Sequence, residues 1–254
     1  MAARVTVIIP AYNASEYIAN AVHSALDQED LPPDEIAVII IDDKSPDREK
    51  LDEALRPFAD DPQVTILHNE TNMGAAESRN RAIDLAQSEY VAFLDADDWW
   101  EPDKLAAQLR LLDEQPQLPL CCSGRMLHAS DGTPVGRTIG VPTEISYDML
   151  LRTNLIPCGS VVMRTRIAKE FHMTNAEFHE DYILWLRVLK KYGNAAAINE
   201  PLLHCRLSEG GKSRNKFKSA RMQIGCYRVM GIGIFKSLYY FACYAVNGVK
   251  KYYT

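Results

Sequence analysis

Short apolar runs alternate with amphipathic stretches along the first 115 residues. Runs without a polar face are typical of strands buried on both sides, whereas apolar positions three and four apart indicate helices. The runs predict strands over Val5–Pro10, Ile36–Ile41, Val64–His68 and Tyr90–Leu94. The amphipathic stretches predict helices over Glu16–Gln28, Ser45–Phe58, Gly74–Gln87 and Pro102–Glu114. This alternation with short links predicts an α/β fold, a mostly parallel sheet with helices on both faces.

The pattern is less regular from residue 116 to residue 210. It predicts strands over Leu118–Leu127, Val135–Ile139, Gly159–Arg164 and Ala195–Ile198, with helices over Ser146–Arg152 and Asp181–Tyr192. No internal repeat or low-complexity linker divides the chain. We therefore expect one domain over 1–210, built from halves at 1–115 and 116–210, and an extension over 211–254.

The extension contains an apolar and aromatic stretch, Val229–Val249, whose length approaches the roughly 20 residues that span a bilayer. Lys236 interrupts the stretch, and Gly231, Gly233 and Gly248 weaken it as a helix. Three interpretations are open: an amphipathic helix in the membrane interface, ordinary packing on the domain, and a membrane span. The interrupted pattern with basic flanks favours the interfacial helix.

Charge is distributed unevenly along the chain. The formal net charge is −6, yet residues 212–254 contain nine Lys or Arg and no Asp or Glu. A basic extension on an acidic domain indicates an anionic partner, such as lipid head groups or phosphates. Nucleic acid is not expected as a partner, because the acidic domain would be repelled by it.

The six cysteines form no C-x-x-C pair and show no zinc-finger spacing. No targeting segment precedes the first predicted strand. We therefore expect reduced cysteines in a cytoplasmic protein.

Polar clusters follow the ends of all four strands predicted in the first half. They are Pro10-Ala11-Tyr12-Asn13, Asp42-Asp43-Lys44-Ser45, Asn72-Met73-Gly74 with Arg79-Asn80, and Asp95-Ala96-Asp97-Asp98. The carboxyl ends of parallel strands share one crevice, which is where open α/β sheets bind ligands. Each cluster alone could be a helix cap or a turn. Convergence on one site explains all four together and is the preferred interpretation.

The chemistry of these groups suits a nucleoside diphosphate held with a metal ion. Clustered carboxylates repel one another, and a hard divalent cation such as Mg²⁺ or Mn²⁺, shared with substrate phosphates, offsets that repulsion. Asp97 is the candidate metal ligand. Tyr12 can stack on a base, Asp43 can accept a hydrogen bond from it, and Arg79 can donate to a phosphate.

In this order the clusters resemble the motifs of glycosyltransferase family 2 over roughly residues 4–210. The resemblance implies the GT-A fold, with 1–115 binding a nucleotide sugar and 116–210 binding the acceptor. The roles it implies are Pro10, Tyr12 and Asp43 around the nucleoside, Arg79 near the diphosphate, Asp95 at the ribose or sugar, and Asp97 on Mn²⁺ or Mg²⁺.

The resemblance extends to Glu180-Asp181, where the family places an acidic general base. It implies Asp181 as the base, Glu180 in contact with the donor or acceptor sugar, and Trp185 on the same helical face as a further donor contact. The alternative is that the two acids only favour a helix N-terminus. The polar loop Arg206–Ser213 could close over the diphosphate or be an ordinary surface loop.

The activity implied is transfer of one sugar, with inversion, from a nucleotide donor that we expect to be UDP-linked to an acceptor hydroxyl. The chain lacks the Q-x-x-R-W sequence and the clear membrane spans of processive synthases in the family. The basic, aromatic extension favours a saccharide acceptor carried on a lipid, used for bacterial surface polysaccharide. The protein would then be peripheral on the inner face of the cell membrane, through residues 217–254.

Other classes fit the sequence less well. A phosphorelay receiver needs acids after its first strand, and a nicotinamide dehydrogenase needs G-x-G-x-x-G there; this chain has Pro-Ala-Tyr-Asn. A sugar nucleotidyltransferase and a non-catalytic nucleotide-binding scaffold remain as alternatives.

Overall fold

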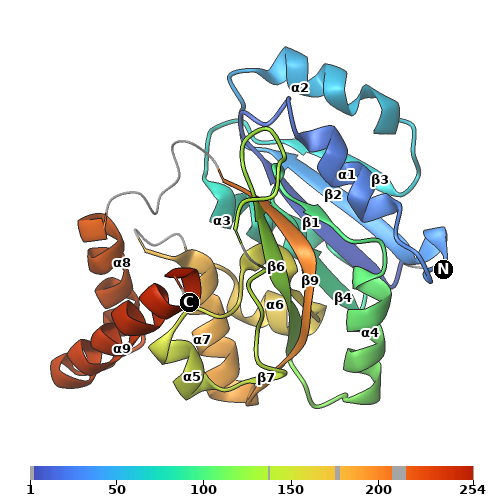
Figure 1. Ribbon diagram of the computed structural model, residues 1–254. Helices are drawn as coiled ribbons and strands as arrows, with labels where there is room; N and C mark the ends of the chain where they lie inside the picture. Colours follow the sequence, from blue (N-terminus) through green and yellow to red (C-terminus); the bar gives the residue numbers. More distant parts are fainter. Residues whose placement is uncertain (1–2, 137, 175–177, 208–215, 254) are drawn as a thin grey trace.

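The computed structural model describes residues 3–136, 138–174, 178–207 and 216–253. One large twisted sheet lies at its centre, with helices against both faces (Figure 1). The expected α/β architecture is confirmed.

Within the described ranges the sheet has nine strands in the order β3-β2-β1-β4-β8-β6-β9-β5, with β7 also paired to β9. The strands are β1 Val5–Ala11, β2 Ile36–Asp42, β3 Val64–His68, β4 Tyr90–Phe93, β5 Trp99–Trp100, β6 Leu120–His128, β7 Glu144–Ile145, β8 Val162–Arg164 and β9 Ala195–Arg206. Strands β1 to β4 pair in parallel. Among the remaining described strands β6 and β9 pair in parallel, while β8, β5 and β7 pair in the antiparallel sense. The parallel arrangement predicted for most of the sheet thus belongs mainly to the first half.

The helices cover the sheet in two groups. They are α1 Ile18–Leu26, α2 Arg48–Leu55, α3 Ala75–Leu85, α4 Lys104–Glu114, α5 Tyr147–Arg152, α6 Thr165–Phe171, α7 Glu180–Tyr192, α8 Lys216–Val229 and α9 Ile234–Tyr253. Short 3₁₀ turns occur at Pro33–Glu35, Arg56–Phe58 and Cys158–Ser160. Side chains of α1, α2 and α4 form one core, and those of α3 and α5 to α8 form the other.

Alternation along the buried strands explains their continuous apolar runs. In β1, Val5, Val7 and Ile9 enter the core with α1, whereas Ile8 enters the core with α3. Because both faces are covered, neither set of positions can be polar. The sequence pattern therefore placed the four parallel strands β1 to β4 correctly, to within a residue at either end.

Several elements of the second half differ from the prediction. The described residues of Val135–Ile139, which exclude residue 137, form no strand; Ile139 bridges to Arg125 of β6, and the preceding Pro134 bridges to His128. Strand β9 continues to Arg206, eight residues beyond the predicted end at Ile198. A register shift opposite Ser123 and Arg125 lets it continue past Pro201, which has no N–H for the ladder. Helix α6 and strand β7 were not predicted, and neither was the short strand β5 of the first half.

Helices α8 and α9 form a hairpin that packs beside α5 and α7 (Figure 1). The buried Tyr227 hydroxyl donates to the Leu151 carbonyl at 2.8 Å, and the Tyr240 hydroxyl contacts Asp148 Oδ1 at 3.2 Å. Packing on the domain therefore accounts for one face of the hairpin. In the part of the chain that the structure describes, no helix combines the length and apolarity needed to cross a membrane.

Candidate active site

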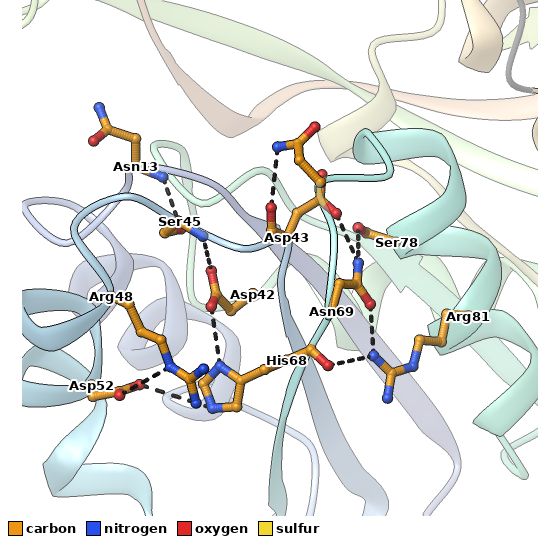
Figure 2. Close-up of polar contacts among 11 residues, drawn as sticks. Asn13, Asp42, Asp43, Ser45, Arg48, Asp52, His68, Asn69, Ser78 and Arg81 are labelled. Atoms are coloured by element: carbon orange, nitrogen blue, oxygen red, sulfur yellow. Dashed lines mark hydrogen bonds and ion pairs between the residues drawn. The ribbon is translucent and has the colours of Figure 1, made fainter.

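Loops that follow β1, β2 and β3 are joined by a buried hydrogen-bond network (Figure 2). Ser45 connects the first two loops, because its Oγ accepts from the Asn13 backbone N–H at 3.0 Å while its own N–H donates to Asp42 Oδ1 at 2.9 Å. His68, at the end of β3, lies 3.1 Å from Asp42 Oδ2. Burial would raise the pKa of Asp42, but hydrogen bonds from Ser45 and His68 outweigh it and lower that pKa. The network fixes the ends of the three parallel strands relative to one another.

Asp43 holds the loop that opens α3. Its Oδ1 accepts from Asn69 Nδ2 and from the Met73 N–H, both at 2.8 Å, and its Oδ2 accepts from the Gly74 N–H at 2.7 Å. Gly74 has φ +88°, a conformation that favours glycine, and is the residue before the first turn of α3. The Asp43 carboxylate therefore positions α3 by fixing its first residues.

Helix α3 presents Arg79, which is only 6% exposed, to the loop that follows β4. Its guanidinium forms an ion pair with Asp95 and lies 3.9 Å from Glu180 Oε1, at the start of α7. Arg79 thus connects three elements that are far apart in sequence. Its Nε is buried and has no hydrogen-bond partner among the residues that the structure describes.

The acidic loop after β4 is held on its other side by Arg206, at the end of β9. The Arg206 N–H donates to Asp98 Oδ1 at 2.9 Å, and its Nε lies 3.3 Å from the Asp97 carbonyl. Burial, reinforced by the neighbouring Asp95 carboxylate, raises the pKa of Asp97. Asp98 is turned inward, and its pKa is also raised by burial and by Asp95 and Asp97.

A cavity of about 700 Å³ lies where these loops meet. Its lining residues are Pro10, Tyr12, Asn13, Ala14, Tyr17, Ala75, Arg79, Asp95, Ala96, Asp97, Cys158, His179, Glu180 and Asp181. Seven of the nine residues singled out in the sequence are among them. Tyr12 is 55% exposed, so its ring is available to a ligand.

The acidic pair at the start of α7 reaches the same cavity as the loops of the first half. Glu180 and Asp181 occupy the first turn of α7, and Asp181 Oδ1 accepts from the Tyr182 N–H at 2.7 Å. Burial and the adjacent Glu180 carboxylate raise the pKa of Asp181. A partly buried carboxylate with a raised pKa is a stronger proton acceptor than a fully exposed one, which suits a general base.

Two residues expected to contact the donor do not line the cavity. Trp185 does not reach the cavity: its side chain is completely buried in the core, with its ring centroid 5.9 Å from that of Phe93. Trp185 lies one helical turn after Asp181, and at that position its side chain packs against Phe93 of strand β4. Asp43 is only 3% exposed and is absent from the cavity lining, because its carboxylate is turned toward the loop over 69–74.

Comparison with known proteins identifies the family. The family model described as "Glycosyl transferase family 2" matches residues 6–169, which is more than half of the chain. The chain belongs to glycosyl transferase family 2.

Relatives match this glycosyltransferase along almost its whole length. It is 38% identical over 249 residues to TuaG of Bacillus subtilis (strain 168), a glycosyltransferase assigned provisionally to teichuronic acid biosynthesis, with 97% of this chain and 96% of TuaG covered. It is 30% identical over 248 residues to WfaP of Escherichia coli, named "UDP-Glc:alpha-D-GlcNAc-diphosphoundecaprenol beta-1,3-glucosyltransferase". That match covers 98% of this chain and 95% of WfaP.

The fold of this glycosyltransferase also matches a solved structure. The mannosyltransferase PcManGT from Pyrobaculum calidifontis, in complex with GDP-Man and Mn²⁺, superimposes with a TM-score of 0.68 at 20% identity. The match covers 91% of this chain and 65% of PcManGT, so the chain spans slightly less than two thirds of that structure. The GT-A-like fold expected from the sequence is confirmed.

The acidic loop after β4 fits a divalent cation that would be held jointly by the protein and by the phosphates of a bound nucleotide. Among the residues placed in the structure, no group of three or more His, Cys, Asp or Glu side chains could hold a metal ion by itself. Asp97 nonetheless lines the cavity beside Asp95, and burial together with the Asp95 carboxylate raises its pKa. A carboxylate such as that of Asp97, combined with phosphate oxygens of a bound nucleotide, makes a donor set that Mg²⁺ or Mn²⁺ prefers.

Sequence reasoning missed several residues behind the acidic loop. The Trp99 ring stacks on His204, with ring centroids 5.1 Å apart, and His204 lies between His128, at 2.9 Å, and Glu101, at 2.7 Å. These residues come from β5, β6, β9 and the start of the segment before α4, so no local motif joins them. A polar loop was expected over Arg206–Ser213, and its residues from 208 onward lie outside the described part of the chain.

Proposed function

We propose that this glycosyltransferase moves one sugar, with inversion, from a UDP-linked donor to a hydroxyl of a lipid-linked saccharide during assembly of a bacterial surface polysaccharide. The observation that carries the proposal is the convergence of Tyr12, Asp97 and Asp181 on one cavity. The names of WfaP and TuaG support this proposal: that of WfaP specifies a UDP-linked donor and a diphosphoundecaprenol-linked acceptor, and that of TuaG a surface polysaccharide. A lipid-linked acceptor would place the protein at the inner face of the cell membrane.

The donor side of the cavity is the edge formed by the loops after β1 and β4. Pro10 and the exposed ring of Tyr12 provide a surface on which a uracil base can stack. Asp97 would hold Mg²⁺ or Mn²⁺, with Asp95 directed to the ribose or sugar. When bound, the cation would neutralise charge on the departing diphosphate.

The acceptor side is the start of α7. We assign proton removal to Asp181: its carboxylate takes the proton of the acceptor hydroxyl as that oxygen bonds to the anomeric carbon. The bond between this carbon and the diphosphate oxygen breaks on the opposite side, and its electron pair leaves with the diphosphate. Attack opposite the leaving group inverts the configuration, and Glu180 would orient one of the sugars.

The role of Arg79 follows from its contacts. It was expected to approach the diphosphate, and it does line the cavity. Its ion pairs with Asp95 and Glu180 suit a second task, because they hold the donor-side and acceptor-side carboxylates at a fixed separation. We propose that Arg79 positions these two acids and presents its remaining positive charge to the donor.

Calorimetric titration with UDP, with and without Mn²⁺, tests the donor site. Metal-dependent binding that is lost in Asp97→Ala and retained in Asp52→Asn, an exposed control on α2, is the expected result. Absence of UDP binding to the wild-type protein would refute the assignment of UDP, and titrations with GDP and TDP would then identify another nucleotide.

A transfer assay separates the proposed activity from the alternatives. Radiolabelled UDP-sugars and a GlcNAc-diphospholipid acceptor should give a labelled lipid product. Release of pyrophosphate from UTP and a sugar phosphate would instead identify a nucleotidyltransferase. Tight UDP binding without any transfer, across a panel of donors and acceptors, would favour a non-catalytic scaffold.

A further inference from the structure

The outward face of α9 is apolar, which is unusual for a helix at the surface of a protein in water. Its exposed residues are Ile234, Phe235, Leu238, Tyr239, Ala242, Ala245 and Val246. At about 100° per residue these seven positions occupy a continuous arc roughly 140° wide. Phe235 is 86% exposed. An apolar arc of this width normally faces a core, so this face needs a partner.

The opposite side of α9 already has its partner. Ser237 is buried, and Tyr240 and Phe241 pack against the core that contains α7 and α8. The helix therefore has two apolar sides. The domain buries one of them, while on the outward side the Arg152 guanidinium lies 5.9 Å from the Tyr239 ring centroid and leaves that residue 53% exposed. Folding of the hairpin does not account for the outward arc, since its side chains remain accessible in the packed structure.

Charge near the arc indicates what covers it. Lys236 is exposed beside the arc, Arg228 is exposed in the last turn of α8, and the sequence from residue 212 to 254 has no carboxylate side chain. A cavity of about 640 Å³ adjoins the turn between α8 and α9, where Lys190 and Lys191 lie beside Val229 and Met230. Apolar side chains bordered by cations match a membrane with anionic head groups. A second copy of the chain fits less well, because pairing would bring these cations together.

The hairpin also adjoins the start of α7. Gly225 of α8 lies directly against the Phe178 ring, with which a Cβ at this position would collide. Phe178 precedes His179, Glu180 and Asp181, which all line the cavity. The hairpin that carries the arc therefore contacts the segment that leads into the residues assigned to the acceptor.

We infer that the outward face of α9, from Ile234 to Val246, docks on an anionic lipid membrane and brings the Asp181 side of the cavity toward a lipid-linked acceptor. The orientation toward an acceptor rests on the proposed function; the docking itself does not. In this arrangement Phe235 and Leu238 enter the acyl boundary, while Arg228, Lys236 and Lys190 contact head-group phosphates.

Co-sedimentation of the full chain with vesicles tests the docking. Phosphatidylglycerol–phosphatidylcholine vesicles are compared with pure phosphatidylcholine vesicles, using wild type, the double variant Phe235→Ser/Leu238→Ser, and Leu85→Ser. Leu85 is a matched control, since it is a leucine on α3 with 49% exposure against 52% for Leu238. The double variant should bind anionic vesicles at least about tenfold more weakly than wild type, and Leu85→Ser should match wild type.

Three results would overturn the inference. The first is vesicle binding by the double variant that equals that of wild type, and the second is an equal loss of binding in Leu85→Ser. The third is a wild-type protein that binds no vesicles and forms a dimer in sedimentation velocity, with the dimer absent in the double variant. UDP titration of the same samples separates the two proposals. UDP binding unchanged in the double variant would show an intact site, whereas absent UDP binding in all three proteins would contradict the proposed function and leave the vesicle result standing.

Discussion

Asp43→Asn tests whether the carboxylate acts by holding the loop that opens α3. The wild-type carboxylate accepts three N–H groups, two on Oδ1 and one on Oδ2. An amide has only one oxygen, so at least one charge-assisted hydrogen bond is lost. If the amide oxygen takes the place of Oδ1 and keeps its two donors, the Gly74 N–H then faces an NH₂ group. The lost bond and the unpaired donor together should cost about 2–4 kcal/mol of unfolding free energy.

Urea unfolding followed by fluorescence of the three tryptophans measures this loss directly. In a chain of this size it corresponds to a fall in melting temperature of roughly 4–16 °C. UDP affinity should fall as well, because the same loop sets the position of Ala75 and Arg79 in the cavity.

Asp52→Asn provides the control for this prediction. Asp52 is half exposed and lies 3.6 Å from Arg48 and 3.9 Å from His68 (Figure 2), contacts typical of a weak surface ion pair. Its substitution should change the unfolding free energy by less than about 1 kcal/mol. If the two variants unfold at the same urea concentration, the Asp43 carboxylate does not hold the loop.

Three further predictions concern other buried groups. Asp181→Asn should lower kcat by roughly 10²–10⁴-fold with UDP affinity retained. Because the Asp181 pKa is raised, the acid limb of the wild-type kcat/KM profile should lie above pH 3.8. Loss of UDP binding in the variant would contradict this role. Trp185→Phe should leave UDP affinity unchanged in calorimetry while lowering stability in urea, whereas weaker UDP binding with unchanged stability would restore a donor contact. Burial lowers the pKa of Lys104 to about 7, so the unfolded chain binds more protons above that pH and stability should rise by up to about 1.4 kcal/mol per unit from pH 7 to 9. In urea titrations Lys104→Met should remove this dependence of stability on pH, whereas Lys190→Met, at an exposed lysine, should keep it. Above pH 9 the Cys121 thiol, whose pKa burial raises to about 11, opposes the rise in stability.

The first half of the fold was predictable because local pattern and tertiary environment agree there. Val5, Ile8 and Ile9 are apolar in sequence because both sheet faces are covered, so the strand could be read without knowledge of its neighbours. The convergence of Tyr12, Asp95 and Asp97 followed from the parallel order of the strands, which the β-α alternation implies.

The remaining differences depend on packing that no local pattern encodes. Asp181 and Trp185 share a helical face, yet the start of α7 projects into the cavity while its next turn lies under Phe93. Strand β9 passes Pro201 only because β6 changes register opposite it. Helix α9 was readable as amphipathic, but which of its two apolar sides the domain covers depends on α5 and α8.

The network that joins the loops after β1, β2 and β3 has a practical consequence for finding the donor. These loops belong to the central sheet, so a nucleotide that binds the cavity stabilises the fold as a whole and does not merely order a detached surface segment. A ligand at 100 times its Kd adds about 2.7 kcal/mol to the free energy of unfolding. Melting temperatures recorded against a panel of nucleotide sugars should therefore rank donors before any acceptor is in hand.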